Sequence, residues 1–327
     1  MNKVRQPWST PPRWFSLRRL RKQLLHIDAA EASFTRRRFH ARDDRTRRRL
    51  EEIGVTFLLG YDAAIEETNF SVLAQRLSLI DRELSGFAFE GAAMGLTLLD
   101  ALTPWNKQRL LEFIHGAGAR HVYMVHVGSG WAIARVPWLR LNLKNHLERL
   151  DPLLRWLALD GYGFHEGYFN WPQYVQEQQA PKHLSALGLR AFDQGLGRSL
   201  WFIEGADVDR IPLTIGKFPS YRRADLWSGI GLACAYAGSV SRNAIEVMQQ
   251  AAGTYAPHLA QGAAFAAKCR QLAGNETEHT DLACHVFAGV SSTQAAAVTD
   301  EALKDLPDNG AYEVWRERIR TALSSKN

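Results

Sequence analysis

Apolar residues recur three and four positions apart over long parts of the chain. The stretch 17–27 places its leucines on one face of a helix, and the stretches 50–66 and 70–84 repeat the same spacing. Strand signals are few. The segment 121–127, His-Val-Tyr-Met-Val-His-Val, alternates like a strand but fits a buried helix equally well. The pattern therefore predicts a mostly α-helical protein.

Basic residues are concentrated at the start of the chain. Residues 1–50 contain 15 lysines and arginines but only 4 acidic residues, whereas the whole chain has a net charge of +6. We interpret residues 1–49 as a basic N-terminal arm and helix, and residues 50–327 as a single α-helical repeat domain. The basic arm suits contact with nucleic acid, lipid or an acidic partner. Acids and bases that alternate from residue 42 onward favour surface ion pairs instead, so nucleic-acid binding is unlikely.

Composition narrows the class of protein further. Hydrophobic residues make up 46% and charged residues 23% of the chain, which is a globular balance. The three cysteines, Cys234, Cys269 and Cys284, are too few and too scattered for a disulfide framework. No apolar run reaches the roughly 18 residues of a membrane helix, and the start of the chain lacks the pattern of a secretory signal. We expect a cytoplasmic protein without a membrane span.

Three glycine-rich segments look alike and suggest an internal repeat. They begin at Gly86, Gly161 and Gly229, and each is followed by a second glycine-rich segment. Glycine inside a helix costs about 1 kcal/mol relative to alanine, so its recurrence indicates close approach of helices or of a ligand. We predict that Gly86, Gly161 and Gly229 start helices. We also predict three helical-hairpin repeats, at about 85–135, 160–215 and 225–294, around a central aromatic-lined cavity.

Five stretches of the chain carry a resemblance to a known family. Residues 86–94 (GFAFEGAAM), 128–135 (GSGWAIAR), 160–169 (DGYGFHEGYF), 197–202 (GRSLWF) and 222–238 (RRADLWSGIGLACAYAG) resemble the bacterial domain of unknown function family 1702. Members of that family are found beside enediyne polyketide synthases. The resemblance therefore implies natural-product biosynthesis, a hydrophobic small-molecule substrate or ligand and a polyketide synthase as protein partner. It implies no particular reaction.

His165 and Glu166 are the first candidates for catalysis. They lie next to each other among aromatic residues, where loss of water would shift their pKa values toward those of an acid–base pair. Glu90 occupies the matching place in the first glycine-rich segment, and Asp225 precedes the third. The same residues would also suit a purely structural role at helix starts.

Aromatic and basic residues around these positions are candidates for substrate binding. Arg222 and Arg223 would hold a carboxylate or phosphate by paired hydrogen bonds, although structural salt bridges explain them as well. The aromatic candidates would line a pocket for an apolar, polyene-like molecule, and they would equally suit an ordinary core. They are Trp131, Tyr162, Phe164, Tyr168, Trp227 and Tyr236.

The chain shows no recognisable site for a metal or another cofactor. His115, His121 and His126 are spaced by six and five residues, which does not place them on one helix face. The glycine-rich segments are followed by no Gly-Lys-Ser/Thr, so they do not match a phosphate-binding loop. We expect neither a metal nor an organic cofactor.

Three functions remain open at this stage. The leading hypothesis is an enzyme that acts on a hydrophobic, polyketide-like intermediate by acid–base chemistry. The second is a non-catalytic carrier or accessory protein for such an intermediate, and the third is a helical-repeat nucleic-acid binder. Ionisable groups clustered at one pocket would favour the enzyme, a wholly apolar pocket the carrier, and a continuous basic groove the nucleic-acid binder.

Overall fold

The structure, a computed structural model, describes residues 17–67, 69–103, 105 and 107–324. These residues form helices joined by turns and short loops, and no strand occurs among them, which confirms the prediction of a mostly α-helical protein. The ambiguous segment 121–127 is helical, since α7 begins at Val122. The predicted helix near residue 17 is confirmed as α1 (Leu17–Leu25), while residues 1–16 of the arm lie outside the described residues.

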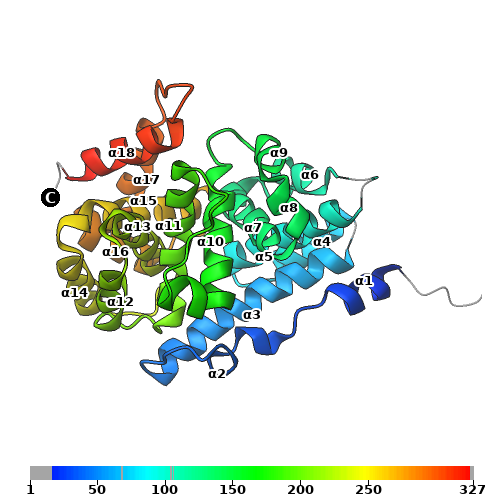
Figure 1. The fold of residues 1–327 in the computed structure, drawn as a ribbon, viewed down its shortest axis with the longest axis horizontal. Helices are drawn as coiled ribbons and strands as arrows, with labels where there is room; N and C mark the ends of the chain where they lie inside the picture. The colour runs from blue at the N-terminus through cyan, green and yellow to red at the C-terminus, as the bar shows by residue number, and fades with distance from the viewer. Residues whose placement is uncertain (1–16, 68, 104, 106, 325–327) are drawn as a thin grey trace, which may run out of the picture.

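A series of long helices forms the core of the protein, and each packs mainly on the helix before it and the helix after it. In chain order these helices are α3 (Asp44–Glu66), α5 (Ser85–Leu102), α7 (Val122–Arg135), α10 (Trp156–Trp171), α11 (Ala186–Ile203), α13 (Ser220–Ala237) and α15 (Ala256–Ala273). Figure 1 shows α10 near the middle of the molecule, with α5 and α7 on one side of it and α11 and α13 on the other.

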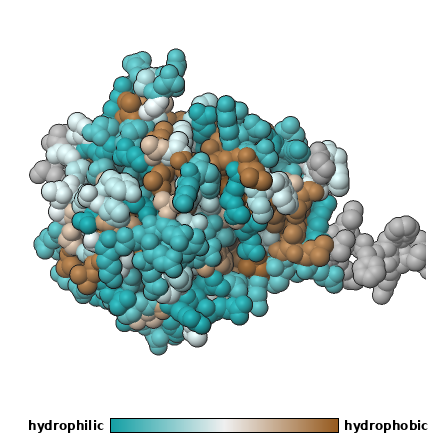
Figure 2. All heavy atoms as spheres, in the orientation of Figure 1, coloured by the Kyte–Doolittle hydropathy of each residue, from teal (hydrophilic) through white to brown (hydrophobic). Residues whose placement is uncertain are grey.

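Shorter helices connect and cover this series. The helices α16, α17 and α18 pack on α15, and α1 packs on α3. Figure 2 shows that the visible face is mostly hydrophilic, with hydrophobic residues in small patches. No described helix is long and apolar enough to cross a membrane. The remaining helices are α2 (Phe34–Arg37), α4 (Phe70–Ser78), α6 (Arg109–His115), α8 (Pro137–Leu141), α9 (Leu143–Glu148), α12 (Arg210–Lys217), α14 (Arg242–Ala252), α16 (Glu278–Ala288), α17 (Ser292–Glu301) and α18 (Ala311–Ser324).

Local sequence explains where many helices begin and end. The side chain of Asp43 accepts a hydrogen bond from the Thr46 amide at the start of α3, and Ser185 caps α11 in the same way. Gly274 adopts a left-handed conformation after α15, where a residue with a β-carbon would be strained. Pro172 follows α10, and within the last turn of α10 the backbone of Asn170 leaves helical geometry.

Glycines allow neighbouring core helices to touch through their backbones. A β-carbon at Gly195 in α11 would lie 1.7 Å from the carbonyl oxygen of Asp160 in α10, and one at Gly163 would lie 1.9 Å from that of Phe192. Contacts that move forward along α10 thus move backward along α11, so the two helices are antiparallel. Further glycines that meet a neighbouring carbonyl in this way are Gly60, Gly91, Gly128, Gly130, Gly161, Gly197, Gly229, Gly231 and Gly262.

Two predicted helix starts differ from the structure, and one helix spans the predicted domain boundary. Gly161 and Gly229 lie inside α10 and α13 rather than at their starts, because these glycines serve helix contacts and not helix initiation. Helix α3 runs unbroken from Asp44 to Glu66, so it crosses the expected boundary between residues 49 and 50. The basic residues just before position 50 therefore belong to the same helix as the apolar residues after it.

Candidate functional site

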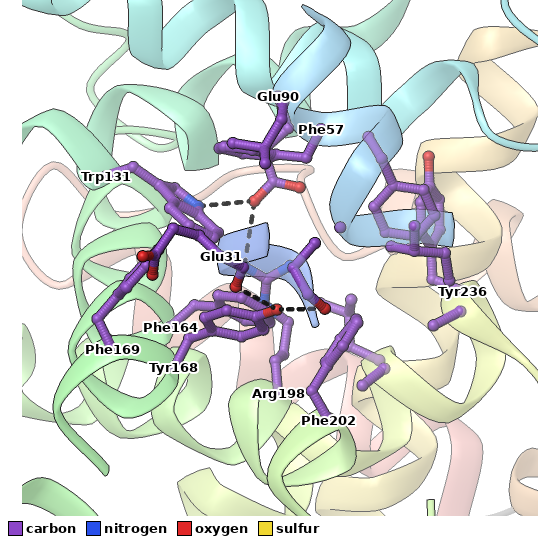
Figure 3. A pocket seen from close by; sticks show the side chains of 18 residues that line it. Glu31, Phe57, Glu90, Trp131, Phe164, Tyr168, Phe169, Arg198, Phe202 and Tyr236 are labelled. Carbon is purple, nitrogen blue, oxygen red and sulfur yellow. Dashed lines mark hydrogen bonds and ion pairs between the residues drawn. The ribbon is translucent and has the colours of Figure 1, made fainter. Parts of the chain in front are cut away.

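An apolar pocket lies among the core helices, and the space between its lining atoms, including space open to solvent, is about 640 Å³. Residues from α3, α5, α7, α10, α11 and α13 form its wall, and Figure 3 shows the aromatic side chains facing it. Among the described residues that line it, three have carboxyl or guanidinium side chains, namely Glu31, Glu90 and Arg198. The uncharged lining residues are Ala32, Ile53, Gly54, Phe57, Leu58, Phe87, Trp131, Phe164, Tyr168, Phe169, Phe202, Leu232, Ala233, Tyr236 and Ala237.

A short helical turn, η1 (Ala29–Ala32), covers one side of this pocket. A β-carbon at Gly54 of α3 would lie 2.9 Å from that of Ala32, so the turn packs directly on the helix. The hydroxyl of Tyr168 lies 3.5 Å from the carbonyl oxygens of Glu31 and Ala32. The part of the chain just after α1 therefore contributes to the pocket wall (Figure 3).

Glu90 is the buried carboxyl group of the pocket, and only 3% of it is exposed. Trp131 Nε1 donates a hydrogen bond to Glu90 Oε1 at 3.0 Å, and Arg198 Nη2 lies 3.7 Å from the same oxygen (Figure 3). Burial raises the pKa of Glu90 to about 7, although Arg198 and Trp131 act in the opposite direction. A carboxyl group with such a pKa can both release and accept a proton near neutral pH.

Arg198 faces two carboxyl groups rather than one. Its Nε lies 2.8 Å from Asp160 Oδ1, and its guanidinium stands 4.9 Å from the ring centre of Phe164. Burial raises the pKa of Asp160, partly offset by Arg198, and the two carboxylates raise the pKa of Arg198 despite its burial. One guanidinium cannot neutralise two buried carboxylates, which favours a proton on one of them.

A chain of buried polar side chains continues from Asp160 toward the C-terminus. Gln194 Nε2 donates to Asp160 Oδ2 at 2.8 Å, and the hydroxyl of Ser228 lies 3.0 Å from Gln194 Oε1 and 3.1 Å from Gln261 Oε1. Arg316 of α18 then donates to Gln261 at 3.2 Å. The chain thus links helices α10, α11, α13, α15 and α18 through their interior.

A sequence pattern marks the polar side chains of this hydrogen-bonded series, although it is not among the motifs singled out above. Glu90, Asp160, Gln194, Ser228 and Gln261 each directly precede a glycine that touches the neighbouring helix. A polar residue at that position lies beside the helix contact and is therefore buried. Arg198, absent from our candidate site residues, lies three residues after one such glycine.

His165 and Glu166 do not meet Glu90 at the pocket wall. His165 packs between the rings of Trp131 and Phe169, with centroids 5.7 Å and 4.7 Å away, and burial lowers its pKa to about 3. His165 is therefore neutral near pH 7. Glu166 accepts a hydrogen bond from Asn170 Nδ2 at 2.6 Å, and burial raises its pKa. Neither residue lines the apolar pocket.

Asp225 lies in a separate ionic cluster outside the pocket. Arg316 Nη2 and Arg190 Nε lie 2.6 Å and 3.1 Å from its two carboxylate oxygens. Burial raises the pKa of Asp225, but the two arginines outweigh burial and hold the pKa below its usual value. Asp225 is inside α13, so it is not a helix cap.

The two arginines expected to bind an anion are used within the fold. Arg222 Nε donates to Asp193 Oδ2 at 2.9 Å, and both side chains are buried. Arg223 Nε donates to the carbonyl oxygen of Phe218 at 2.7 Å, at the end of α12. Both side chains therefore stabilise the packing of α13 on its neighbours, and neither lines the apolar pocket.

The aromatic candidates divide into two groups. Trp131, Phe164, Tyr168 and Tyr236 line the pocket, together with residues that we did not single out, such as Phe57 and Phe202. The other two candidates do not line it. Tyr162 packs edge-on against Phe192 at 5.3 Å, and Trp227 is buried in α13.

The histidines considered for a metal are scattered. His121 stacks on Phe89 with ring centres 4.0 Å apart, and His126 Nδ1 is bonded to the carbonyl oxygen of Val122 at 2.7 Å. Among the described residues, no group of three or more His, Cys, Asp or Glu side chains is placed to hold a metal ion.

The fold and the site together define an all-helical protein with an aromatic pocket and a buried carboxylate–arginine cluster. The chain belongs to the family described as protein of unknown function (DUF1702), whose model matches residues 16–323. The resemblance found in the sequence is thereby confirmed. No curated protein and no solved structure gave a match to the chain.

Proposed function

We propose that this protein is an enzyme that moves protons on an apolar substrate held in the aromatic pocket, with Glu90 as the acid–base group. The observation that carries the proposal is the buried Glu90 carboxyl group, held by Trp131 and Arg198, in a pocket otherwise lined almost wholly by apolar side chains. Burial there raises the pKa of Glu90 toward neutrality. Ionisable groups clustered at one pocket favour an enzyme over a non-catalytic carrier.

A proton shift along a conjugated chain is the simplest reaction for this arrangement. The Glu90 carboxylate removes a proton from a carbon next to the conjugated system, and the electrons of that C–H bond enter the system. The resulting carboxylic acid returns the proton to another carbon, so the product is an isomer and no oxidant is consumed. Arg198 stabilises negative charge beside Glu90 during the transfer.

The substrate class follows from the lining. The stacked and tilted rings of Trp131, Phe164 and Tyr168 suit a narrow, conjugated hydrocarbon chain. The place of the family beside enediyne polyketide synthases, which the sequence resemblance implies, is the ground for proposing a polyketide or polyene-like intermediate of bacterial, enediyne-type natural-product biosynthesis, with a polyketide synthase as partner. The buried free cysteines suit a reducing, cytoplasmic setting.

A carrier is the second candidate function. It is supported by the apolar lining, which would shield a reactive chain from water without any chemistry. A nucleic-acid binder receives less support, because basic side chains near the start of α3 pair with acids: Arg47 with Glu51 at 2.9 Å, and Arg49 with Glu52 at 3.0 Å.

We further propose that the pocket is central to three similar helix pairs, α5 with α7, α10 with α11 and α13 with α15. Similar backbone contacts at Gly128, Gly195 and Gly262 support such units. Superposing the three pairs should align these glycines. Different crossing geometries in the three pairs would rule the repeat out.

Glu90→Gln tests the enzyme proposal, and Glu166→Gln is its matched comparison. Both changes remove a buried carboxyl group, but only Glu90 lines the pocket. Mass spectrometry of molecules that co-purify with the native protein identifies the substrate. In a producing strain, Glu90→Gln should lower product formation by roughly 10²–10⁴-fold, while Glu166→Gln retains most of it.

If Glu166→Gln lowers product formation and Glu90→Gln does not, the catalytic carboxyl group is Glu166, as the sequence predicts. A carrier predicts that both variants still support product formation, with less ligand retained by Glu90→Gln. The thermal midpoints of the purified variants show whether any loss reflects unfolding.

A further inference from the structure

A second hollow lies against the apolar pocket and differs from it in character. It encloses about 1420 Å³, including space open to solvent, and polar side chains make up much of its wall. Tyr236 and Ala237, at the end of α13, line both the hollow and the apolar pocket. A molecule that extends past these two residues would pass from an apolar to a polar environment.

Three arginines at the start of α3 or just before it line this hollow, which we call the polar cleft: Arg42, Arg45 and Arg49. Arg49 is paired with Glu83, another residue of the wall. Arg42 and Arg45 are exposed, and their side chains make no hydrogen bond or salt bridge with another described residue, although Arg42 lies near Asp43. Two guanidinium groups are therefore available to a ligand.

The acidic and polar neighbours of the cleft are already engaged. Asp43 accepts hydrogen bonds from both the amide and the hydroxyl of Thr46, at 2.8 Å and 2.9 Å. His279 Nε2 is bonded to the carbonyl oxygen of Cys234 at 3.0 Å. The hydroxyl of Ser239, in contrast, is buried in the cleft wall without a hydrogen-bond partner.

Helix polarity adds to the positive character of the cleft. The capping residues of α3, α14 and α16, which are Asp43, Ser241 and Thr277, all line it. The N-terminal ends of three helices thus border one space, and a helix N-terminus carries a partial positive charge. Together with Arg42 and Arg45, this arrangement is suited to an anion.

We infer that the polar cleft binds the anionic head, a phosphate or a carboxylate, of the molecule whose apolar chain occupies the aromatic pocket. This inference rests on the proposed function and specifies its substrate class: a long apolar chain that ends in an anion. Arginine forks bind phosphate and carboxylate by paired hydrogen bonds. The apolar chain of the ligand would run beside Tyr236 from the polar cleft to the aromatic pocket.

Calorimetric titration with three ten-carbon probes tests this assignment. Decyl phosphate and decanoate carry the two kinds of head, and decanol has the same chain without charge. All are used below their micelle concentrations in low salt, because screening weakens exposed ion contacts. We expect decyl phosphate or decanoate to bind the wild-type protein roughly tenfold or more tightly than decanol. The head that binds more tightly identifies the natural one.

The variant Arg42→Gln/Arg45→Gln should remove this advantage and leave decanol binding unchanged. Arg48→Gln is the matched control, since Arg48 is exposed on the same helix but does not line the cleft. Equal binding of charged and uncharged probes, or an equal loss in Arg48→Gln, would overturn the assignment while leaving the pocket intact. Failure of all three probes to bind would overturn the pocket proposal as well.

Discussion

Glu90 owes its chemistry to the residues that other helices place around it. Trp131 of α7 and Arg198 of α11 contact one of its oxygens, and Asp160 of α10 competes for the same guanidinium. Two carboxyl groups and one arginine are buried here. Protonating one carboxyl group therefore costs less free energy than burying a second negative charge.

The raised pKa of Glu90 predicts how stability depends on pH. Between pH 4.5 and about 7 the folded state keeps a proton that the unfolded state has released, so the free energy of unfolding falls as pH rises. Glutamine has no proton to lose. The free energy of unfolding of Glu90→Gln, relative to wild type, should therefore increase by up to about 3 kcal/mol between pH 5 and pH 8.

Urea denaturation at the two pH values measures this difference. Burial also raises the pKa of Asp193, to about 6, but that contribution is common to both proteins and cancels. A difference that stays constant from pH 5 to pH 8 would mean that Glu90 ionises normally in the fold.

At the scale of helices, glycine sets how closely the core elements approach. Backbone contact between α10 and α11 is possible because neither Gly163 nor Gly195 has a side chain. The same contact fixes the position of Asp160, whose carbonyl faces Gly195, and hence that of Arg198. Close helix packing and the geometry of the site therefore have one origin.

Gly195→Ala should separate α10 from α11 and lower the free energy of unfolding by roughly 3 kcal/mol or more. Its β-carbon would lie 1.7 Å from a backbone oxygen, which cannot move without moving the helix. Gly216→Ala in α12 is the control, because nothing lies within 4 Å of the added atom. Alanine there should be neutral or slightly stabilising.

Chemical denaturation of the two variants checks this contrast. Equal stability of Gly195→Ala and wild type would show that the helices have room to separate. If Gly195→Ala yields no folded protein while Gly216→Ala folds normally, the prediction holds in its stronger form.

At the scale of the whole molecule, the end of the helix series is joined back to its beginning. Arg270 of α15 donates to the carbonyl oxygens of Glu83 and Tyr236, at 3.1 Å and 2.7 Å. Asn275 Nδ2 donates to the carbonyl oxygen of Arg82 at 3.0 Å. The bonds to Glu83 and Arg82 connect residues almost two hundred positions apart and favour unfolding in one step.

Arg270→Met should lower the free energy of unfolding by roughly 3–5 kcal/mol, since it leaves buried carbonyl oxygens unpaired. Arg242→Met is the control. Arg242 is exposed, and its ion pair with Glu246, at 3.7 Å, contributes little to stability. Tryptophan fluorescence and far-ultraviolet circular dichroism should report the same transition. Separate transitions for the two probes would show that the ends of the series unfold independently.

The sequence by itself determined the helical class, the glycine-rich segments and part of the pocket. Apolar spacing identifies helices because it reflects a local period. Of the candidate site residues, Glu90, Trp131, Phe164, Tyr168 and Tyr236 line the apolar pocket, and their role there stays a prediction. The neighbours His165 and Glu166 were expected to act there together. Successive residues of a helix point about 100° apart, so they do not share one face.

Only the tertiary structure decided which charged groups meet. Arg198 is 108 positions from Glu90 and 38 from Asp160 along the chain, and nothing local to any of them specifies the others. Their contact depends on how α5, α7, α10 and α11 pack through glycine, which is a property of the assembled helices. Burial, which raises the pKa of Glu90, exists only once that packing excludes water.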